Sequence, residues 1–227
     1  MKPVASFFIL TILTALSVSA QTPQRSSVLA TGTGSVSVTP DQAQINVSAI
    51  TQAATAQDAT TQNATIAANI IAQVTQALGG SGTVQTVNYS VSPVYSYPKD
   101  GSAAVLTGYT VTNSIQVTLN NLTIAGKIID TAVQAGASRI DSLQFSLKDD
   151  SSARAQALSA ATLKAKAKAA AMASSVGLKT GSFITIQESG AMVQAVTLTG
   201  APTATTPIQS GNLTVTGNVT ISMDLTQ

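Results

Sequence analysis

The sequence predicts an α+β fold in which largely antiparallel sheets carry three helices on one face, built as two β/α halves. Three observations favour this class. Polar and apolar residues alternate in nearly every predicted strand, whereas parallel sheets buried on both faces show continuous apolar runs. Three other segments repeat apolar residues or alanines at every fourth position, which is typical of helices. Strands and helices follow one another along the chain, so the helices must cover one face of the sheets.

The first two predicted strands follow a short polar segment. Val36 and Val38 alternate with Ser and Thr, Pro40 and Asp41 favour a turn, and Ile45 resumes the alternation. We expect these two strands to pair with each other as a hairpin.

Gly32 and Gly34, at the start of this hairpin, resemble a fragment of a phosphate-binding loop. Such a loop needs its glycines at the start of a helix, where free N–H groups and the helix dipole face the anion. A strand follows here instead, without a third glycine at the required spacing. We interpret the two glycines as permitting a bulge or a close backbone contact.

Apolar spacing and stop signals predict the next elements. The first helix runs from Thr55 to the glycines at 79–80, and a strand pair with its turn at 98–101 follows. Asn121 can cap the second helix, which ends at Gly136.

The longest predicted helix follows a strand at 143–147, begins at 149–151 and ends near Val176. Small residues at four-residue spacing give it a smooth side that can approach a sheet or another helix closely: Ala157, Ala161, Ala165, Ala169 and Ala173. Strands are expected again at 183–187 and 213–225. The segment at 190–211 between them is rich in Thr, contains two prolines, and predicts a long mobile loop.

Residues 1–20 are typical of a cleavable secretory signal. Lys2 precedes an apolar run at 4–18, and small residues lead to Ala20. The run is shorter than the ~20 residues of a membrane-spanning helix. We therefore expect a periplasmic protein, and association with the outer membrane stays open.

The composition argues against several classes of function. The 11 Lys and Arg residues nearly balance the 9 Asp and Glu residues, so we expect no nucleic-acid partner, which would need a clustered basic face. The chain has no His and no Cys, and Glu188 is its one glutamate. The commonest general base and the commonest metal ligands are thus missing. We predict a non-enzymatic protein with no catalytic, cofactor-binding or metal-binding residues.

Clustered charges have structural interpretations. Asp149 and Asp150 complement the dipole at a helix N-terminus, which requires no acid–base pair or cation site. Lys164 and Lys168 share a helix face while Lys166 points away, so the three lysines form a solvated helix surface and not one dense patch.

Other candidates lie on strands and at a helix start. Four tyrosines flank the second strand pair and favour cross-strand packing, with an oligomer contact or sugar stacking as the alternative: Tyr89, Tyr95, Tyr97 and Tyr109. Arg139 and Asp141 are expected to pair on one strand face. Arg154 can dock on a carbonyl or a carboxylate.

Three segments, taken together, resemble the SIMPL family, which is also described as a domain of unknown function. These segments are Gly32–Ile45, Gly108–Leu119 and Ile128–Gly177. The last contains Gly-Ala, a strand ending in Phe-x-Leu, Arg-x-x-Ala-Leu and spaced alanines. The resemblance covers Val28–Leu225 and places one such domain at 28–227. It implies a periplasmic or outer-membrane-associated protein of a family in which some members are immunogenic, some are linked to stress tolerance, and at least one type forms ring-like or channel-like oligomers. It implies no catalytic residues.

These observations predict an exported protein that self-assembles into a homo-oligomer, with an envelope or stress-related role. We expect its contacts to use strand faces or edges near Tyr89–Leu119, with the 190–211 loop at a rim. The alternative is a periplasmic small-ligand or protein-binding module. The sequence identifies no small-molecule ligand for it.

Overall fold

The computed structural model describes residues 26–99, 101–195, 208 and 210–227 and confirms the α+β class. Its elements follow the order β1 (Ser27–Val38), β2 (Gln42–Ala53), α1 (Ala56–Leu78), β3 (Gly82–Ser96), β4 (Val105–Leu119), the 3₁₀ helix η1 (Leu122–Ile124), α2 (Ala125–Gln134), β5 (Arg139–Ser146), α3 (Ser151–Ser175), β6 (Lys179–Ala195) and β7 (Leu213–Thr226). The expected signal at 1–20 lies outside the described residues.

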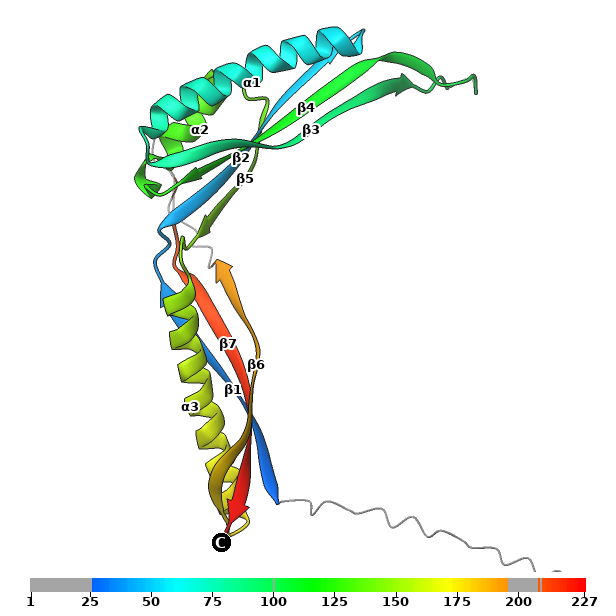
Figure 1. The fold of residues 1–227 in the computed structure, drawn as a ribbon. Coiled ribbons are helices and arrows are strands. Elements are labelled where there is room, and N and C mark those ends of the chain that lie inside the picture. Colours follow the sequence, from blue (N-terminus) through cyan, green and yellow to red (C-terminus); the bar gives the residue numbers. More distant parts are fainter. Residues whose placement is uncertain (1–25, 100, 196–207, 209) are drawn as a thin grey trace, which may run out of the picture.

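The strands form two antiparallel sheets that lie end to end in an elongated molecule (Figure 1). One sheet has four strands in the order β3-β4-β2-β5, and the other has three in the order β1-β7-β6. Helices α1 and α2 cover one face of the first sheet, and α3 covers one face of the second. The two predicted β/α halves therefore correspond to the two sheets with their helices.

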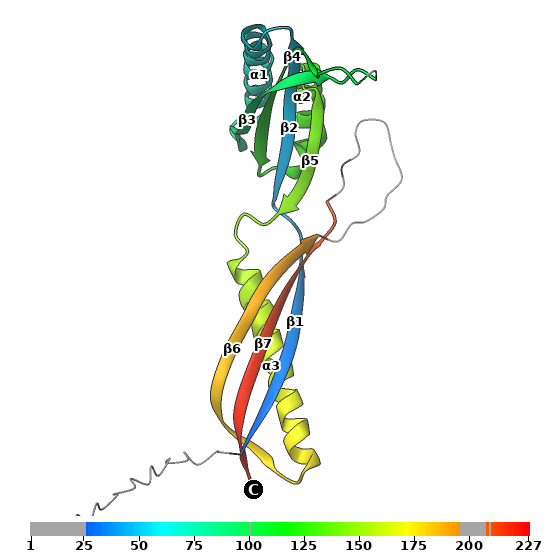
Figure 2. The same ribbon diagram turned by 90° about the vertical axis from the view of Figure 1, so that its right-hand side faces the viewer.

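The predicted pairing of the first two strands is wrong. β1 pairs with β7 along its whole length, whereas β2 lies between β4 and β5 in the other sheet. The segment at 39–41 crosses from one sheet to the other, as Figure 2 shows. Asp41 anchors this crossing by accepting a 2.7 Å hydrogen bond from the Lys148 backbone N–H. Alternation identifies a strand with one buried face, but it does not specify the neighbouring strand.

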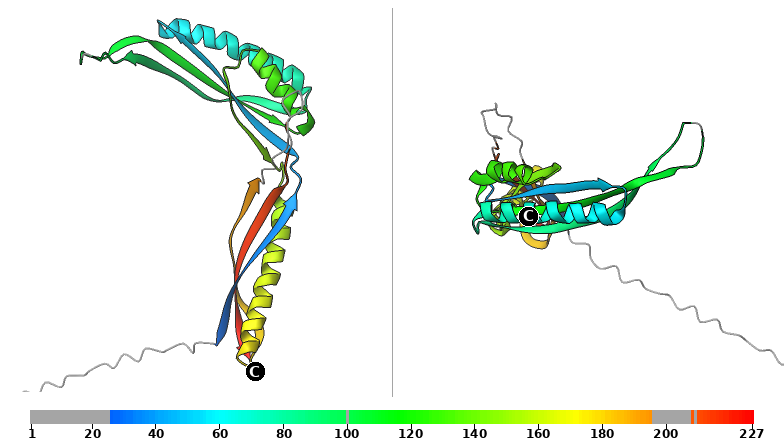
Figure 3. Two further views of the ribbon diagram at one scale, coloured as in Figure 1. Left: turned by 180° about the vertical axis from the view of Figure 1, so that it is seen from behind. Right: turned by 90° about the horizontal axis from the view of Figure 1, so that it is seen from above.

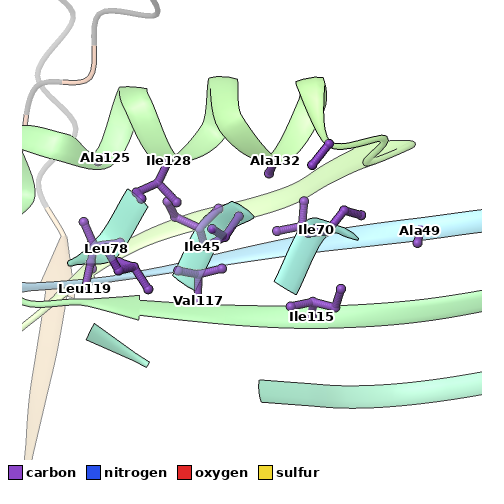
Figure 4. Packing of buried hydrophobic residues seen from close by; sticks show 14 of the residues in the cluster. Ile45, Ala49, Ile70, Leu78, Ile115, Val117, Leu119, Ala125, Ile128 and Ala132 are labelled. Atoms are coloured by element: carbon purple, nitrogen blue, oxygen red, sulfur yellow. The ribbon is translucent and has the colours of Figure 1, made fainter. Parts of the chain in front are cut away.

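An aliphatic core lies between the four-stranded sheet and its helices (Figure 4). Its fully buried side chains include Ile45 on β2, Ile115 on β4, Ile70 on α1 and Ile128 on α2. Each branched side chain removes enough apolar surface from water to contribute on the order of 1.5–3 kcal/mol.

Helix α1 begins and ends at the predicted signals. The Thr55 hydroxyl accepts a 3.1 Å hydrogen bond from the Asp58 N–H, and Gly79 ends the helix with a left-handed φ of 55°. Asn121 also acts as a cap, because its side chain accepts from the Thr123 N–H at 3.1 Å. That cap starts η1, and α2 itself begins at Ala125.

Helix α3 packs on the three-stranded sheet through small residues. Its buried side consists of the predicted alanines together with Ala153. The glycines of β1 provide the matching surface: a Cβ on Gly32 would lie 2.1 Å from the Ala161 carbonyl oxygen, and one on Gly34 would lie 2.3 Å from that of Ala157. The expected close backbone contact is therefore the role of these two glycines, since any larger residue would displace the helix.

Strand β6 is longer than predicted. It extends to Ala195, so residues 190–195 belong to a strand and not to the expected loop at 190–211. A register shift between Glu188 and Ala191, with Gly190 at a φ of 95°, interrupts the pairing and lets it resume. The rest of that loop lies outside the described residues, apart from Ile208 and residues 210–211. No helix in the described ranges is long and apolar enough to cross a membrane.

Candidate interaction surface

The two acidic residues before α3 both engage local partners. Asp149 accepts a 2.9 Å hydrogen bond from the Ser151 backbone N–H, and this bond lowers the pKa of the Asp149 carboxyl below its ordinary value. Asp150 accepts a 2.7 Å hydrogen bond from Arg154 Nε, so the partner of Arg154 includes a carboxylate. The two carboxylates thus lie at the start of the helix and engage its first turn.

Arg139 and Asp141 pair on β5, as the sequence predicts. Asp141 also accepts a 2.5 Å hydrogen bond from the Ser48 hydroxyl on β2. The ion pair therefore lies on the helix-free face of the four-stranded sheet and connects β5 to its neighbour.

A row of polar side chains, not predicted from the sequence, crosses the same face. Gln85 on β3 donates to Gln116 on β4 at 3.0 Å, and Gln116 donates to Asn46 on β2 at 3.3 Å. Asn46 in turn donates to Ser142 on β5 at 2.9 Å. The four side chains bond one another across all four strands. Amides at polar strand positions were the available signal, but their alignment depends on the register of three strand pairs.

Asn63 was not predicted from the sequence either. It is fully buried on α1 and donates to the carbonyl oxygens of Ala49 at 2.9 Å and Val111 at 3.3 Å. A single side chain thereby ties α1 to both β2 and β4. A buried amide among apolar neighbours is costly unless it is bonded, so Asn63 specifies the position of the helix along the sheet.

Beyond α1, strands β3 and β4 continue as a projecting hairpin, which we call the arm (Figure 3). Helix α1 begins at Ala56, and β2 ends at Ala53, which pairs with Tyr109. Residues farther out on β3 and β4 consequently extend past both elements.

One face of β3 and β4 exposes large apolar and aromatic side chains. We define the arm surface as Tyr89, Val91 and Tyr95 of β3, Tyr97 just after β3, and Leu106 of β4. Tyr89, Val91 and Tyr95 lie an even number of residues apart on β3, and Leu106 lies directly opposite Tyr95, so these four point to one side of the sheet. Tyr97 is 78% exposed, and the other four are 42–48% exposed. Tyr109, on the same side, is half-buried. Cross-strand packing alone therefore does not cover these side chains.

An open depression of about 540 Å³ lies beside α2. Its lining includes Thr123, Lys127, Asp130 and Gln134 from η1 and α2, with Ile208 at its margin. The lining combines one positive and one negative side chain with hydroxyl and amide groups. Such a surface could contact a small polar molecule or a partner. Within the described ranges, no group of three or more His, Cys, Asp or Glu side chains could hold a metal ion.

The three lysines of α3 lie on two flanks of the helix. A Cβ on Gly34 of β1 would lie 2.8 Å from the Ala160 Cβ. The flank of α3 that contains Ala160, Lys164 and Lys168 therefore lies on the side of the helix above β1. Lys166 falls on the opposite flank with Leu158, which contacts the Gly217 position of β7. The lysines thus do not form one dense patch.

The two sheets with their helices, and a match of this sequence to one protein family, define the class of this protein. The chain belongs to the SIMPL family, described as proteins of unknown function (DUF541), and the match covers residues 28–223. Nearly all described elements lie within that range.

Individual relatives are more informative about the compartment. The chain is 28% identical over 170 residues to proteins named "26 kDa periplasmic immunogenic protein" of Brucella melitensis and of Brucella abortus, covering 74% of this chain and 68% of each relative. It is also 28% identical over 176 residues to the uncharacterized protein YggE of Edwardsiella ictaluri, covering 74% of this chain and 70% of that protein. Two of these relatives are thus named as periplasmic.

Proposed function

We propose that this chain is an exported periplasmic protein that acts without catalysis by assembling into a ring-like or channel-like homo-oligomer with an envelope or stress-related role. The observation that carries the proposal is the arm surface. Three exposed tyrosines and two aliphatic side chains lie along β3, β4 and the residue after β3, and three of them (Tyr95, Tyr97 and Leu106) lie on the part of the hairpin that extends past β2 and α1. Tyrosine is enriched at protein interfaces because its ring packs while its hydroxyl bonds water or a partner.

Export is supported by two features. Residues 1–20 have the composition of a secretory signal, and the Brucella relatives are named as periplasmic. Expression of the full chain in a Gram-negative host should place it in the periplasmic fraction, with Gln21 as the new N-terminus by Edman or mass analysis. Recovery in the cytoplasm with Met1 retained would contradict export. Retention in the outer-membrane pellet after salt washing would favour association with that membrane.

Low charge favours self-association. Only 9% of the residues are charged, and the arm surface contains none, so two copies can approach there without desolvating ionised groups. The absence of His and Cys from the whole sequence supports a role in contacts over one in bond-making.

Light scattering on the full chain purified from the periplasm tests assembly. At tens of micromolar we expect a particle several times the mass of one chain. The double variant Tyr95→Ser/Tyr97→Ser should dissociate it, because two exposed rings leave the contact. Leu163→Ser is the matched control, since Leu163 is 66% exposed on α3, away from the arm. A wild-type protein that stays monomeric would refute assembly, and equal masses for all three would refute the role of the arm surface.

The second candidate is a small-ligand or protein-binding module, favoured by the depression beside α2. Thermal-shift screening against periplasmic metabolites tests it, because a ligand that binds only the native state raises the melting temperature. Lys127→Ala should abolish any shift that arises in this depression, while Lys99→Ala, on the arm hairpin, should leave it unchanged.

A further inference from the structure

We propose that the three-stranded sheet continues from one copy of this chain to the next, with the free edge of β6 pairing in parallel with the free edge of β1 of a second copy. The proposal rests on the self-association proposed above and names a second interface for it. This interface is separate from the arm surface, because β1 and β6 belong to the other sheet.

Within the described residues, no strand pairs with the outer edge of β1. The strand pairs with β7 along one edge only, for twelve residues and without a register shift. Its sequence, SVLATGTGSVSV, contains no charged residue and no proline. Proteins normally protect an edge strand with Lys, Pro, a bulge or a covering element. An unpaired edge of this length is therefore suited to binding another strand.

Helix α3 extends over that open edge. A Cβ on Gly34 would lie 2.8 Å from the Ala160 Cβ, whereas the Leu158 side chain contacts the Gly217 position on β7. The Ala160 flank of α3 thus faces away from β7. Four-residue spacing places Lys164, Lys168, Met172 and Val176 along the same flank. In Figure 2 the lower half of α3 lies beyond β1, on the side away from β7.

Strand β6 lacks a helix over most of its helix-side surface within the described residues. Helix α3 packs mainly on β1 and β7 and leaves the far strand largely uncovered. The β6 residues opposite the buried positions of β7 share the helix side of the sheet, and three of them are Phe183, Ile186 and Glu188. Phe183 is 42% exposed and Ile186 is 57% exposed. A second copy that adds its β1 and α3 beside β6 would cover these side chains.

We consider the added β1 strand paired with β6 without an offset. Residues of β6 and β1 that pair with the same β7 residue then lie beside each other across the new interface. Phe183 pairs with Met223 and Met223 with Val28, so Phe183 comes beside Val28. Met172 in the last turn of α3 and Val176 just after it lie at this end of the sheet.

Four residues farther along β1, the same pairing brings an acidic side chain of β6 close to basic side chains of α3 from the next copy. Glu188 pairs with Val219 and Val219 with Gly32, which lies against Ala161 and Ala165 of α3. Lys164 lies between those two alanines on the overhanging flank. Glu188 is the one acidic residue of β6, and it would approach this lysine and Lys168 of the next copy.

The direction of pairing follows from the observed sheet. β6 and β1 are each antiparallel to β7, so they run in the same direction. A copy added by rotation about an axis along the strands keeps this direction and forms a parallel pair. β6 pairs regularly with β7 over two stretches, 185–188 and 191–195. Pairing of β1 with these two stretches supplies about 9 backbone hydrogen bonds, comparable with the ~10 of a typical stable interface.

Disulfide trapping tests the arrangement, and the sequence has no cysteine to interfere. Thr31 and Gln187 both pair with Thr220, so they occupy the same level on either side of β7. Two strand spacings of about 4.8 Å separate them within one chain, which exceeds the ~7 Å limit for a disulfide. Under mild oxidation the variant Thr31→Cys/Gln187→Cys should therefore form a reducible ladder of covalent multimers.

The single variants are the controls. Each should remain monomeric on a denaturing gel. A dimer of Thr31→Cys alone would indicate β1–β1 pairing, and a dimer of Gln187→Cys alone would indicate β6–β6 pairing. Either result would overturn the proposed interface.

Charge reversal provides a second measurement that needs no introduced cysteine. Glu188→Lys should raise the dissociation constant of the assembly at least tenfold at low salt. Adding Lys164→Glu and Lys168→Glu to that variant should restore it. Lys127→Glu is the control, because Lys127 lies on α2 beside the other sheet. Circular dichroism should report the same fold for all of these variants.

The outcomes separate this interface from self-assembly itself. An oligomer by light scattering that gives no ladder and tolerates Glu188→Lys would overturn the β1–β6 contact and leave self-assembly standing. A monomeric wild type without a ladder would overturn both.

Discussion

The two sheets of this protein are covered by helices in different ways. The four-stranded sheet meets α1 and α2 through branched side chains such as Ile70, Ile115 and Ile128, which fill a space between layers. The three-stranded sheet meets α3 through alanines and the glycines Gly32 and Gly34, which let the two backbones touch. The first interface depends on buried apolar area, and the second depends on close approach.

This difference has a consequence for surface exposure. Two helices cover the four-stranded sheet, whereas α3 alone covers the three-stranded sheet, sits close to β1 and β7, and covers β6 poorly. The exposed apolar residues of β6 follow from that arrangement. The packing chemistry of one interface thereby leaves a strand available for a partner.

The largest expected effect comes from removing volume at the first interface. Ile115→Ala should lower the free energy of unfolding by about 2–5 kcal/mol, because it removes a fully buried side chain and leaves a cavity. The matched truncation at the second interface, Ala165→Gly, should cost only about 1 kcal/mol. Urea unfolding followed by circular dichroism measures both, and equal losses would contradict the contrast between the interfaces.

At the second interface, adding volume should cost more stability than removing it. Gly32→Ala places a methyl group 2.1 Å from the Ala161 carbonyl oxygen, and forcing α3 away should cost about 1–3 kcal/mol. Gly181→Ala is the control in the same sheet, because its nearest contacts are side-chain atoms of Thr226 and Asp224 at 3.1 and 3.3 Å. Thermal unfolding compares them. If Gly32→Ala proves as stable as Gly181→Ala, the close approach is not required.

The starts of the helices differ on a smaller scale. Thr55→Ala removes the side-chain cap of α1 and should cost about 1 kcal/mol. Asp150 makes no such cap bond at the start of α3, so Asp150→Ala should lose only the partly exposed pair with Arg154, about 0.3–0.5 kcal/mol. Chemical denaturation resolves the difference, and a larger loss at Asp150 would contradict it.

The smallest effect should appear only as a pH dependence. The Ser151 N–H lowers the pKa of Asp149 from its ordinary value of 3.8, so the ionised carboxylate stabilises the folded state. This contribution is present above that ordinary value and is lost as the pH falls through the lowered pKa. The stability difference between wild type and Asp149→Asn should therefore shrink on acidification below about pH 3.8. A difference that grows in acid would contradict this sign.

Local signals identified most elements and few of their neighbours. Thr55 and Gly79 mark the ends of α1 because capping depends on residues within one turn. The alanine spacing of α3 likewise predicted which side of that helix is buried. The hairpin of β1 with β2 was wrong because its evidence, Pro40 and Asp41, indicates a turn and not a partner.

The surfaces were predicted less completely than the elements. The tyrosines of the second strand pair were identified as candidates from their spacing, but their exposure depends on where β2 ends and α1 begins. The amide row from Gln85 to Ser142 and the bonds of Asn63 depend on strand register across the whole sheet. No short stretch of sequence contains that information.

The sequence by itself determined the α+β class, the positions of the helices and most strands, and the small-residue side of α3, because periodicity and capping act within a few residues. Only the tertiary structure decided that β1 joins β7, where Thr33 bonds Asn218 across 185 positions of sequence. It also decided that, among the described residues, one face of the arm and most of the helix side of β6 are exposed. Pairing and exposure are properties of distant segments brought together. They depend on the free energy of the whole packed chain and not on any local pattern.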